Sequence, residues 1–440
     1  MSGLFDGTFA RGGAAAAVSD PAWLDALLDV EAALARAAAR TGLVATTAAD
    51  AVSRACAEPA GLDLATVVAR AADAGNPVPP LVRVLQDAVG PDAARAVHVG
   101  ATSQDVLDTA LVLVARRALA AIDRDLVVAA EAAAGLAREH RDDVVMGRTL
   151  MQQALPTTFG LKAAGWLAGL AGARARLLAV DASLPVQYGG AVGTLVASDG
   201  SGVDLRTALA AELGLTATPV AWHTVRLPIA DLAGALGAAA GVLATVAVDV
   251  VLMAQTEVGE VSEGGSRGGS SAMPHKHNPV AAISARACAR RAPGLVATLF
   301  AAMEQEHERS AGAWHSEWPT TSDLLATVGS AAAWLAECLT DLRPDVARMA
   351  ANAEAARDPE LAGALADALT PSLGRSAAHD AAAEAVHEAR RSGTPLAEVV
   401  AARFDVDATA LLASGPDVGE ASAQVEAVLS EYDRNTGRTA

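Results

Sequence analysis

Apolar residues recur at helical spacing along most of this chain. The clearest run lies between Asp20 and about Arg40, where leucines follow one another at intervals of three, four and seven residues. Asp20 is placed to cap this helix, and Pro21 stands at its first position, where proline is favoured. Alanine, the strongest helix former, dominates the apolar positions, whereas aromatic residues make up only 3%. The pattern predicts an all-α fold.

Polar and glycine-rich breaks divide this helical pattern into three parts. Because 440 residues exceed one ordinary core, we expect three helical domains at 1–100, 101–350 and 351–440. The central part holds the longest predicted helices, one of them from about Pro228 to Glu263. A last long helix is expected from Pro344, and from about Ala355 we expect short, charged helices.

The stretch Leu232–Val248 carries no charge and has Gly237 and Gly241 at small-xxx-small spacing. A membrane span is the alternative interpretation. The stretch is slightly short for a bilayer, however, and is bounded by Asp231 and Asp249 without aromatic or basic flanks. A helix that is apolar on every side is otherwise a buried helix of a large bundle. We therefore expect core packing, within the chain or across a subunit interface, and no membrane.

The composition argues against several classes of function. A net charge of −18 leaves no basic stripe for nucleic acid, so a local cluster of positive charge would indicate an anionic substrate. The three cysteines, Cys56, Cys288 and Cys338, are far apart, which fits a reduced, cytoplasmic compartment. The tract 307–318 contains two histidines, but HExxH is absent, so we expect no metal and no cofactor.

The most unusual segment is Gly264–Val280, GGSRGGSSAMPHKHNPV. It carries Lys276, one of only two lysines in the chain. A phosphate-binding loop is excluded because GxxxxGK[ST] is absent, and a serine-hydrolase elbow because GxSxG is absent. A flexible linker would explain the glycines but not the compact MPHKHNP. The composition favours a mobile loop that delivers Ser270 and holds an anion with Lys276 and Asn278.

Other polar breaks offer hydrogen-bond donors. Thr102 and Ser103 precede an apolar helix whose N-terminus could bind an anion, although they could also act only as helix caps. Asp105 and Asp108 are expected to be ordinary first-turn acids favoured by the helix dipole. The break at 147–160 is expected to be a loop with donors, and 187–193 a flexible one.

Four of these segments resemble the fumarase/aspartase superfamily. GSSAMPHKHNP at 269–279 resembles its GSSxMPxKxNP signature. Three further segments resemble other motifs of the superfamily and occur in the same order: HVGATSQDVLDTA, GRTLMQQALPTTFG and GGAVGT. The resemblance covers about residues 15–350. It implies three helical domains, a central long-helix bundle that forms a tetramer core, and active sites shared between subunits.

The resemblance also implies residue roles. Ser270 matches the serine that acts as general acid/base, with Lys276 as a competing proton donor. The substrate-binding residues it implies, together with neighbouring donors, are His98, Thr102, Ser103, Arg148, Thr149, Gln152, His275, Asn278 and Arg309.

Within the superfamily, HVGATSQDVLDTA and EQEHERSAGAWHSEW are most similar to the 3-carboxy-cis,cis-muconate cycloisomerase group. This group implies that a small tricarboxylate closes to a lactone through an aci-carboxylate intermediate, in protocatechuate breakdown. Leu150 stands where many superfamily lyases carry a histidine, which disfavours adenylosuccinate lyase. That enzyme and a catalytically silent helical scaffold remain the alternatives.

Overall fold

The structure, a computed structural model, describes residues 3–196, 200–265, 267–269, 273, 276–413 and 415–437. It confirms an all-α fold, with only two short two-stranded sheets among the described residues. In the first half of the chain the elements are α1 Asp6–Phe9, α2 Gly13–Ala17, α3 Asp20–Arg40, α4 Thr46–Ala57, η1 Pro59–Gly61, α5 Leu64–Ala74, α6 Val78–Val89, η2 Ala94–Ala96, α7 Ser103–Glu139, β1 Val144–Thr149, β2 Gln152–Thr158, α8 Phe159–Ser183 and α9 Gly202–Leu213.

The second half of the chain continues the helical pattern. Its elements are α10 Leu227–Met253, β3 Val261–Glu263, α11 Val280–Ala289, α12 Ala292–Ala301, α13 Ala313–Thr340, β4 Leu342–Pro344, α14 Val346–Glu354, α15 Asp358–Leu373, α16 Arg375–Ser392, α17 Leu396–Arg403, α18 Ala408–Leu411 and α19 Ala421–Thr436. The helix expected between Pro344 and about Ala355 is present as α14, but with nine residues it is short rather than long.

The chain forms two compact units. The first contains residues up to 128, 172–247 and 281–336, and the second contains 129–171, 248–280 and the residues from 337 onward. Four of the five boundaries fall inside the long helices α7, α8, α10 and α13, so each of these helices contributes to both units, and the fifth lies at the start of α11. The division into domains at 1–100, 101–350 and 351–440 stays a prediction.

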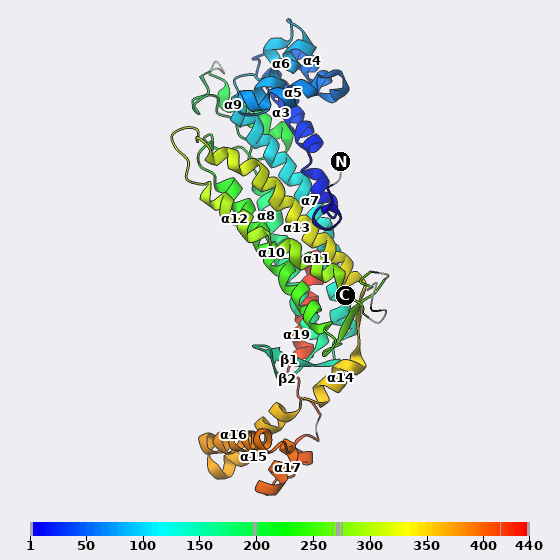
Figure 1. The fold of residues 1–440 in the computed structure, drawn as a ribbon. Coiled ribbons are helices and arrows are strands. Elements are labelled where there is room, and N and C mark those ends of the chain that lie inside the picture. The colour runs from blue at the N-terminus through cyan, green and yellow to red at the C-terminus, as the bar shows by residue number, and fades with distance from the viewer. Residues whose placement is uncertain are drawn as a thin grey trace. The chain divides into compact units, whose positions relative to one another are not determined.

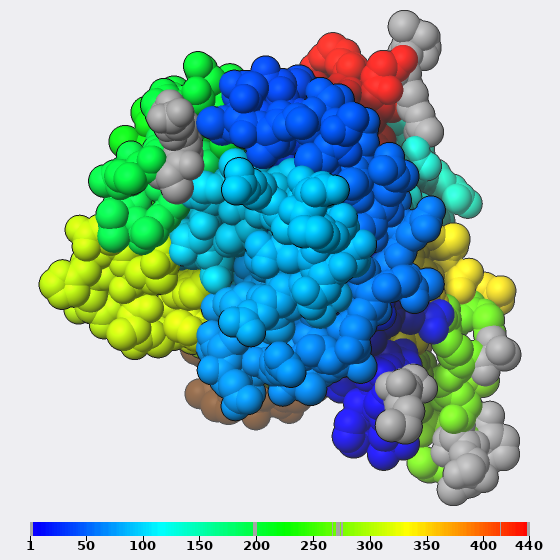
Figure 2. Space-filling view, turned by 90° about the horizontal axis from the view of Figure 1, so that it is seen from above, coloured from blue at the N-terminus to red at the C-terminus, as the bar shows by residue number. Residues whose placement is uncertain are grey.

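Helix α3 organises the N-terminal part of the first unit. Ser19, rather than the expected Asp20, caps it by accepting a hydrogen bond from Ala22 N, and Asp20 is the first helical residue, where the helix dipole favours an acid. Its buried face packs against α4 and α9. Figure 1 shows α3 to α6 gathered at one end of this unit, and Figure 2 looks onto that end, with these residues in blue and light blue.

Helix α10 contains the uncharged stretch. It ends at Met253 rather than at the expected Glu263, and a turn leads from it to β3. It is the one helix of the described chain long and apolar enough to cross a membrane, by length and composition alone. Leu232, Leu236 and Leu243 are buried within the first unit, as in a core helix. The opposite face stays exposed.

The second unit holds both sheets. Strands β1 and β2 form an antiparallel hairpin from Val144↔Thr158 to Thr149↔Gln152, with a bulge between Met146 and Arg148. The loop predicted at 147–160 is therefore a hairpin followed by the start of α8. Strands β3 and β4 pair from Val261↔Pro344 to Glu263↔Leu342. Further along the chain, helices α15 to α18 share a separate apolar cluster (Figure 1, orange).

Candidate active site

The N-terminus of α7 is fixed by a buried carboxylate. Asp105 is 2% exposed and accepts hydrogen bonds from Thr102 N (3.0 Å), Gly189 N (2.9 Å), Gly190 N (2.8 Å) and His223 Nε2 (2.7 Å). Asp105 lies in the first turn, as expected. The expectation of an ordinary first-turn acid is wrong, however, because its carboxylate is buried. Four donors satisfy this carboxylate, as a buried charge requires.

The segment 187–193, expected to be a flexible loop, is held in place at its buried end. Gly189 and Gly190 donate their amides to Asp105, and Gln187 N donates to Thr109 Oγ1 at 2.9 Å. Gly190 has φ +73, a conformation that suits glycine. The α7 N-terminus and this segment thus form one rigid support within the first unit.

A buried ion network lies one turn further along α7. Arg226 is fully buried and bonds Asp108 through Nη1 (2.7 Å) and Nη2 (3.0 Å), and Glu317 through Nε (3.0 Å) and Nη2 (2.5 Å). Trp314 Nε1 also donates to Asp108, at 2.8 Å. Burial alone would lower the pKa of Arg226, but Asp108 and Glu317 outweigh it and raise the pKa.

Sequence reasoning missed this network. Asp108 was expected to be a first-turn acid at the helix surface, but it is 0% exposed. Its partners Arg226 and Trp314 lie 118 and 206 residues away in the sequence. The only sequence signal was a lone arginine shortly before the uncharged stretch Leu232–Val248.

Arg309 lies beside the start of α7. Its Nε donates to Gln104 Oε1 at 3.1 Å, and its Nη2 donates to Ala191 O at 3.1 Å. Gln104 is fully buried, and its amide group donates in turn to Asp108 at 3.2 Å and to His223 O at 2.8 Å. Because Gln104 follows Ser103 directly, the structure brings Arg309 close to the predicted Thr102 and Ser103.

His98 completes the predicted residues of the first unit. Its Nδ1 donates to Glu31 Oε1 at 2.7 Å, and its backbone N donates to Glu31 Oε2 at 3.0 Å. Burial by itself would lower the pKa of His98, but the carboxylates of Glu31 and Asp105 raise it. The first unit therefore gathers a histidine, two hydroxyls and a guanidinium around one helix N-terminus, an arrangement suited to carboxylates.

The hairpin of the second unit carries Arg148, Thr149 and Gln152. Arg148 makes a two-point pair with the fully buried Glu260, at 2.8 and 2.6 Å. This pair fixes the hairpin, and the substrate-binding role predicted for Arg148 stays a prediction. Thr149 and Gln152 pair with each other across the two strands next to the hairpin turn, and both side chains are exposed.

Two residues with left-handed backbones make the turn of this hairpin. Leu150 has φ 49 and Met151 has φ 67, which matches a type I′ turn without the usual Asn-Gly. Leu150 is 96% exposed. Bulky residues rarely adopt this backbone, and such strain is often found at functional sites.

The loop that carries Lys276 is closed at its base. Asn278 donates its backbone N (2.9 Å) and its Nδ2 (3.0 Å) to the carbonyl of Gly268. Gly268 has φ +86, and a side chain there would meet Asn278 O, so glycine is required. On the same stem, Arg267 pairs with Glu337 and with Asp341.

Within this loop, the Lys276 side chain is exposed, and its ammonium group has no ion-pair partner in the part of the chain that the structure describes. Ser270 and His275 lie outside the described residues. Lys276, Asn278, Arg148, Thr149 and Gln152 thus belong to the second unit, and His98, Thr102, Ser103 and Arg309 to the first. Their roles stay predictions.

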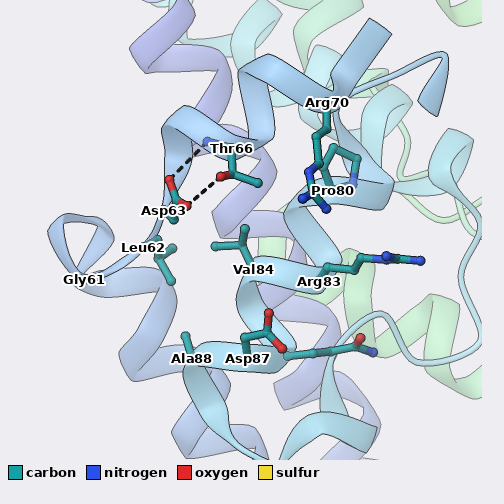
Figure 3. Close-up of a pocket in the computed structure, with 11 residues that line it drawn as sticks. Gly61, Leu62, Asp63, Thr66, Arg70, Pro80, Arg83, Val84, Asp87 and Ala88 are labelled. Atoms are coloured by element: carbon teal, nitrogen blue, oxygen red, sulfur yellow. Dashed lines mark hydrogen bonds between the residues drawn. The ribbon is translucent and has the colours of Figure 1, made fainter. Parts of the chain in front are cut away.

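The described residues contain no group of three or more His, Cys, Asp or Glu side chains placed to hold a metal ion. A polar cavity of about 530 Å³ lies between α5 and α6, lined among others by Arg70, Arg83 and Asp87 (Figure 3). Asp63, at its edge, accepts hydrogen bonds from Thr66. None of the predicted site residues lines this cavity.

Comparisons with known proteins show which family this chain resembles. A lyase family model matches residues 14–294. A 3-carboxy-cis,cis-muconate cycloisomerase of Bradyrhizobium diazoefficiens is 47% identical over 80% of this chain and 79% of its own length. A nitrosuccinate lyase of Streptomyces davaonensis is 43% identical over 92% of this chain and 88% of its own length.

Solved structures give the same result. The crystal structure of the 3-carboxy-cis,cis-muconate lactonizing enzyme from Pseudomonas putida covers 98% of this chain and 99% of its own, with a TM-score of 0.88 and 39% identity. A fumarate lyase from Mesorhizobium covers 94% of this chain and 96% of its own, with a TM-score of 0.85 and 33% identity. The chain belongs to the lyase family of the fumarase/aspartase superfamily.

Proposed function

We propose that this chain is a cycloisomerase that converts 3-carboxy-cis,cis-muconate into a carboxymuconolactone. The observation that carries the proposal is similarity over nearly the whole chain to a lactonizing enzyme, at a TM-score of 0.88 over 98% of the residues. Cycloisomerases of this name reach 47% identity. The pathway context is protocatechuate breakdown, and no cofactor is required by the chemistry.

The reaction is an isomerisation, so every atom of the substrate stays in the product. One carboxylate oxygen forms a bond to a carbon of the diene, and the displaced electron pair moves toward a neighbouring carboxylate as an aci-carboxylate. A proton then adds to the carbon next to that carboxylate. Donors fixed before the reaction stabilise the charge as it develops.

Different hydrogen-bond donors of the described residues suit different carboxylates of the substrate. The hydroxyls of Thr102 and Ser103, with Arg309, lie at the N-terminus of α7 and suit one carboxylate. Lys276 has an exposed ammonium and suits the carboxylate on which charge develops. We assign proton transfer to Ser270 because of the signature sequence, with Lys276 as the competitor.

The assembly is proposed to be a cytoplasmic homotetramer. The exposed face of α10 within the first unit includes the small residues Ala238, Gly241 and Thr245, and a side chain on Gly241 would meet nothing within 4 Å. Helices pack closely through such faces. We infer that this face packs on another copy, which sedimentation equilibrium tests directly.

A second candidate is β-elimination from a substituted succinate. The observation in its favour is that the nitrosuccinate lyase matches 92% of this chain, more than the 80% matched by the cycloisomerase of Bradyrhizobium. In such a reaction a base removes the proton next to a carboxylate, and the bond from the neighbouring carbon to nitrogen breaks. The same aci-carboxylate would form, so the site alone serves both reactions.

The test is a substrate panel on the purified tetramer. Cycloisomerisation removes the conjugated diene, so the ultraviolet absorbance of 3-carboxy-cis,cis-muconate should fall, and NMR should identify the lactone. Nitrosuccinate and adenylosuccinate are assayed in parallel. Turnover of nitrosuccinate without loss of the diene would replace the proposal with the second candidate, and no turnover of any of them would indicate a silent scaffold.

A further inference from the structure

Among the described residues, a buried carboxylate of α3 accepts hydrogen bonds from one residue, and that residue is a predicted site residue. Glu31 is 0% exposed. Both of its oxygens accept from His98: Oε2 from the backbone N at 3.0 Å and Oε1 from Nδ1 at 2.7 Å. The two residues are 67 positions apart in the sequence, so the contact is made only by the fold.

Glu31 also accounts for an unusual backbone at His98. This residue has φ 59, in the left-handed region that few residues other than glycine adopt. Such a conformation is unfavourable for residues other than glycine and persists only where the surroundings determine it. The hydrogen bond from His98 N to Glu31 directs the backbone, and the bond from Nδ1 directs the ring.

The bond from Nδ1 to Glu31 determines which nitrogen of the His98 imidazole carries a proton. A carboxylate can only accept, so Nδ1 carries the proton in this bond. The other nitrogen, Nε2, lies across the ring from Glu31, and it has no hydrogen-bond partner within the described ranges. The side chain is 18% exposed and stands four positions before Thr102, at the anion-binding end of α7.

We propose that Glu31 is a positioning residue that holds His98 so that Nε2 donates a hydrogen bond to a substrate carboxylate. The role rests on the proposed function, because it needs an anionic substrate at this helix end. A buried carboxylate with one histidine partner contributes little net stability compared with an apolar residue. The orientation that Glu31 gives to His98 explains why a carboxylate is present at this buried position.

Two carboxylates face His98, from different helices. Glu31 comes from α3 and Asp105 from α7, and Asp105 is itself bonded to His223. Both favour the imidazolium form, in which Nε2 is a donor. Activity that needs this donor is lost as the pH rises through the pKa of His98, which gives a basic limb in kcat/KM.

The test compares Glu31→Gln with a matched control, Glu212→Gln. Glu212 also binds side chains of α3, with Arg36 Nε at 2.6 Å and Arg40, but it does not touch His98. In Glu31→Gln the basic limb of kcat/KM should move to lower pH, and KM should rise about tenfold or more with a smaller change in kcat. Glu212→Gln should keep the wild-type profile. An unmoved limb in Glu31→Gln would overturn the proposal.

A second readout does not depend on turnover. The His98 resonance of ¹³Cε1-histidine-labelled protein, assigned with His98→Gln, is titrated with pH and then with propane-1,2,3-tricarboxylate. Glu31→Gln should lower the pH at which His98 titrates and weaken tricarboxylate binding about tenfold. If titration and binding match the wild type, Glu31 does not position His98. If only the diene assay of the wild type fails, the proposed substrate is wrong and the role of Glu31 stands on these two measurements.

Discussion

Arg226 and Asp108 form a two-point ion pair at 2.7 and 3.0 Å in which neither side chain is exposed. Glu317 holds the other edge of the same guanidinium. Arg226→Met should therefore lower the free energy of unfolding by about 3–5 kcal/mol, because it leaves two buried carboxylates without their cation. Denaturant unfolding at fixed protomer concentration measures this.

The matched control for that prediction is Arg403→Ala. Arg403 pairs with Glu384 and Glu388 at the surface, and exposed pairs contribute at most about 1 kcal/mol. A loss for Arg226→Met no larger than that of the control would contradict the view that this network organises the first unit.

Gln104→Leu should impair substrate binding. The change removes the acceptor for Arg309 Nε and leaves Asp108 and His223 O without one donor. We expect kcat/KM to fall about 10- to 100-fold, mainly through KM, because an unsatisfied buried group costs about 1–3 kcal/mol. Steady-state kinetics on the folded variant decides this, and an unchanged KM would show that Arg309 does not depend on Gln104.

The hairpin turn should be improved by the residues that a type I′ turn favours. Replacing Leu150 with Asn and Met151 with Gly relieves two left-handed non-glycine residues, so unfolding should cost about 1–2 kcal/mol more. Leu155→Asn, on the exposed side of β2, is the control and should give no gain. Thermal and denaturant unfolding test the pair, and a loss in the double variant would mean that the apolar tip is itself bound.

Ser270→Ala should lower turnover by about 10²–10⁴-fold with little change in stability, as expected for loss of a general acid/base. Lys276→Met should also be impaired, whereas Lys162→Met is the matched control. Lys162 is the other lysine of the chain, and it faces Asp249 at 3.5 Å. If Ser270→Ala keeps near wild-type turnover while Lys276→Met is inactive, the lysine is the proton donor.

The His98–Glu31 pair should make stability depend on pH. Because the folded pKa of His98 is raised, its contribution is fully present below the unfolded value and is lost as the pH rises through the folded value. The difference in unfolding free energy between the wild type and Glu31→Gln should therefore shrink on going from acidic to basic pH. A difference that stays constant with pH would show that the pair stabilises only as a neutral hydrogen bond.

Local patterns predicted the parts of the fold that depend on local physics. Leucine spacing identified α3, and the Thr102–Ser103 pair, expected just before the helix, placed the start of α7 to within one residue. The hairpin was missed because its turn residues, Leu150 and Met151, carry no turn signal, and the strand residues next to the turn are polar.

The candidate site was predictable only in outline. The family that the signature sequence predicted is confirmed, and the site roles of Lys276 and Asn278 stay predictions. The environments of Asp105 and Asp108 were not predictable, because most of their partners come from segments 79 to 206 residues away. Glu31 was missed for the same reason, since nothing local distinguishes it from other acids on α3.

The central claim concerns the substrate, and it is tested most directly by the ratio of kcat/KM for 3-carboxy-cis,cis-muconate to kcat/KM for nitrosuccinate. Both values are measured on one preparation of the wild-type protein at one pH. A cycloisomerase should favour the diene by several orders of magnitude and release the lactone. A ratio below one, with cleavage of nitrosuccinate, would contradict the account.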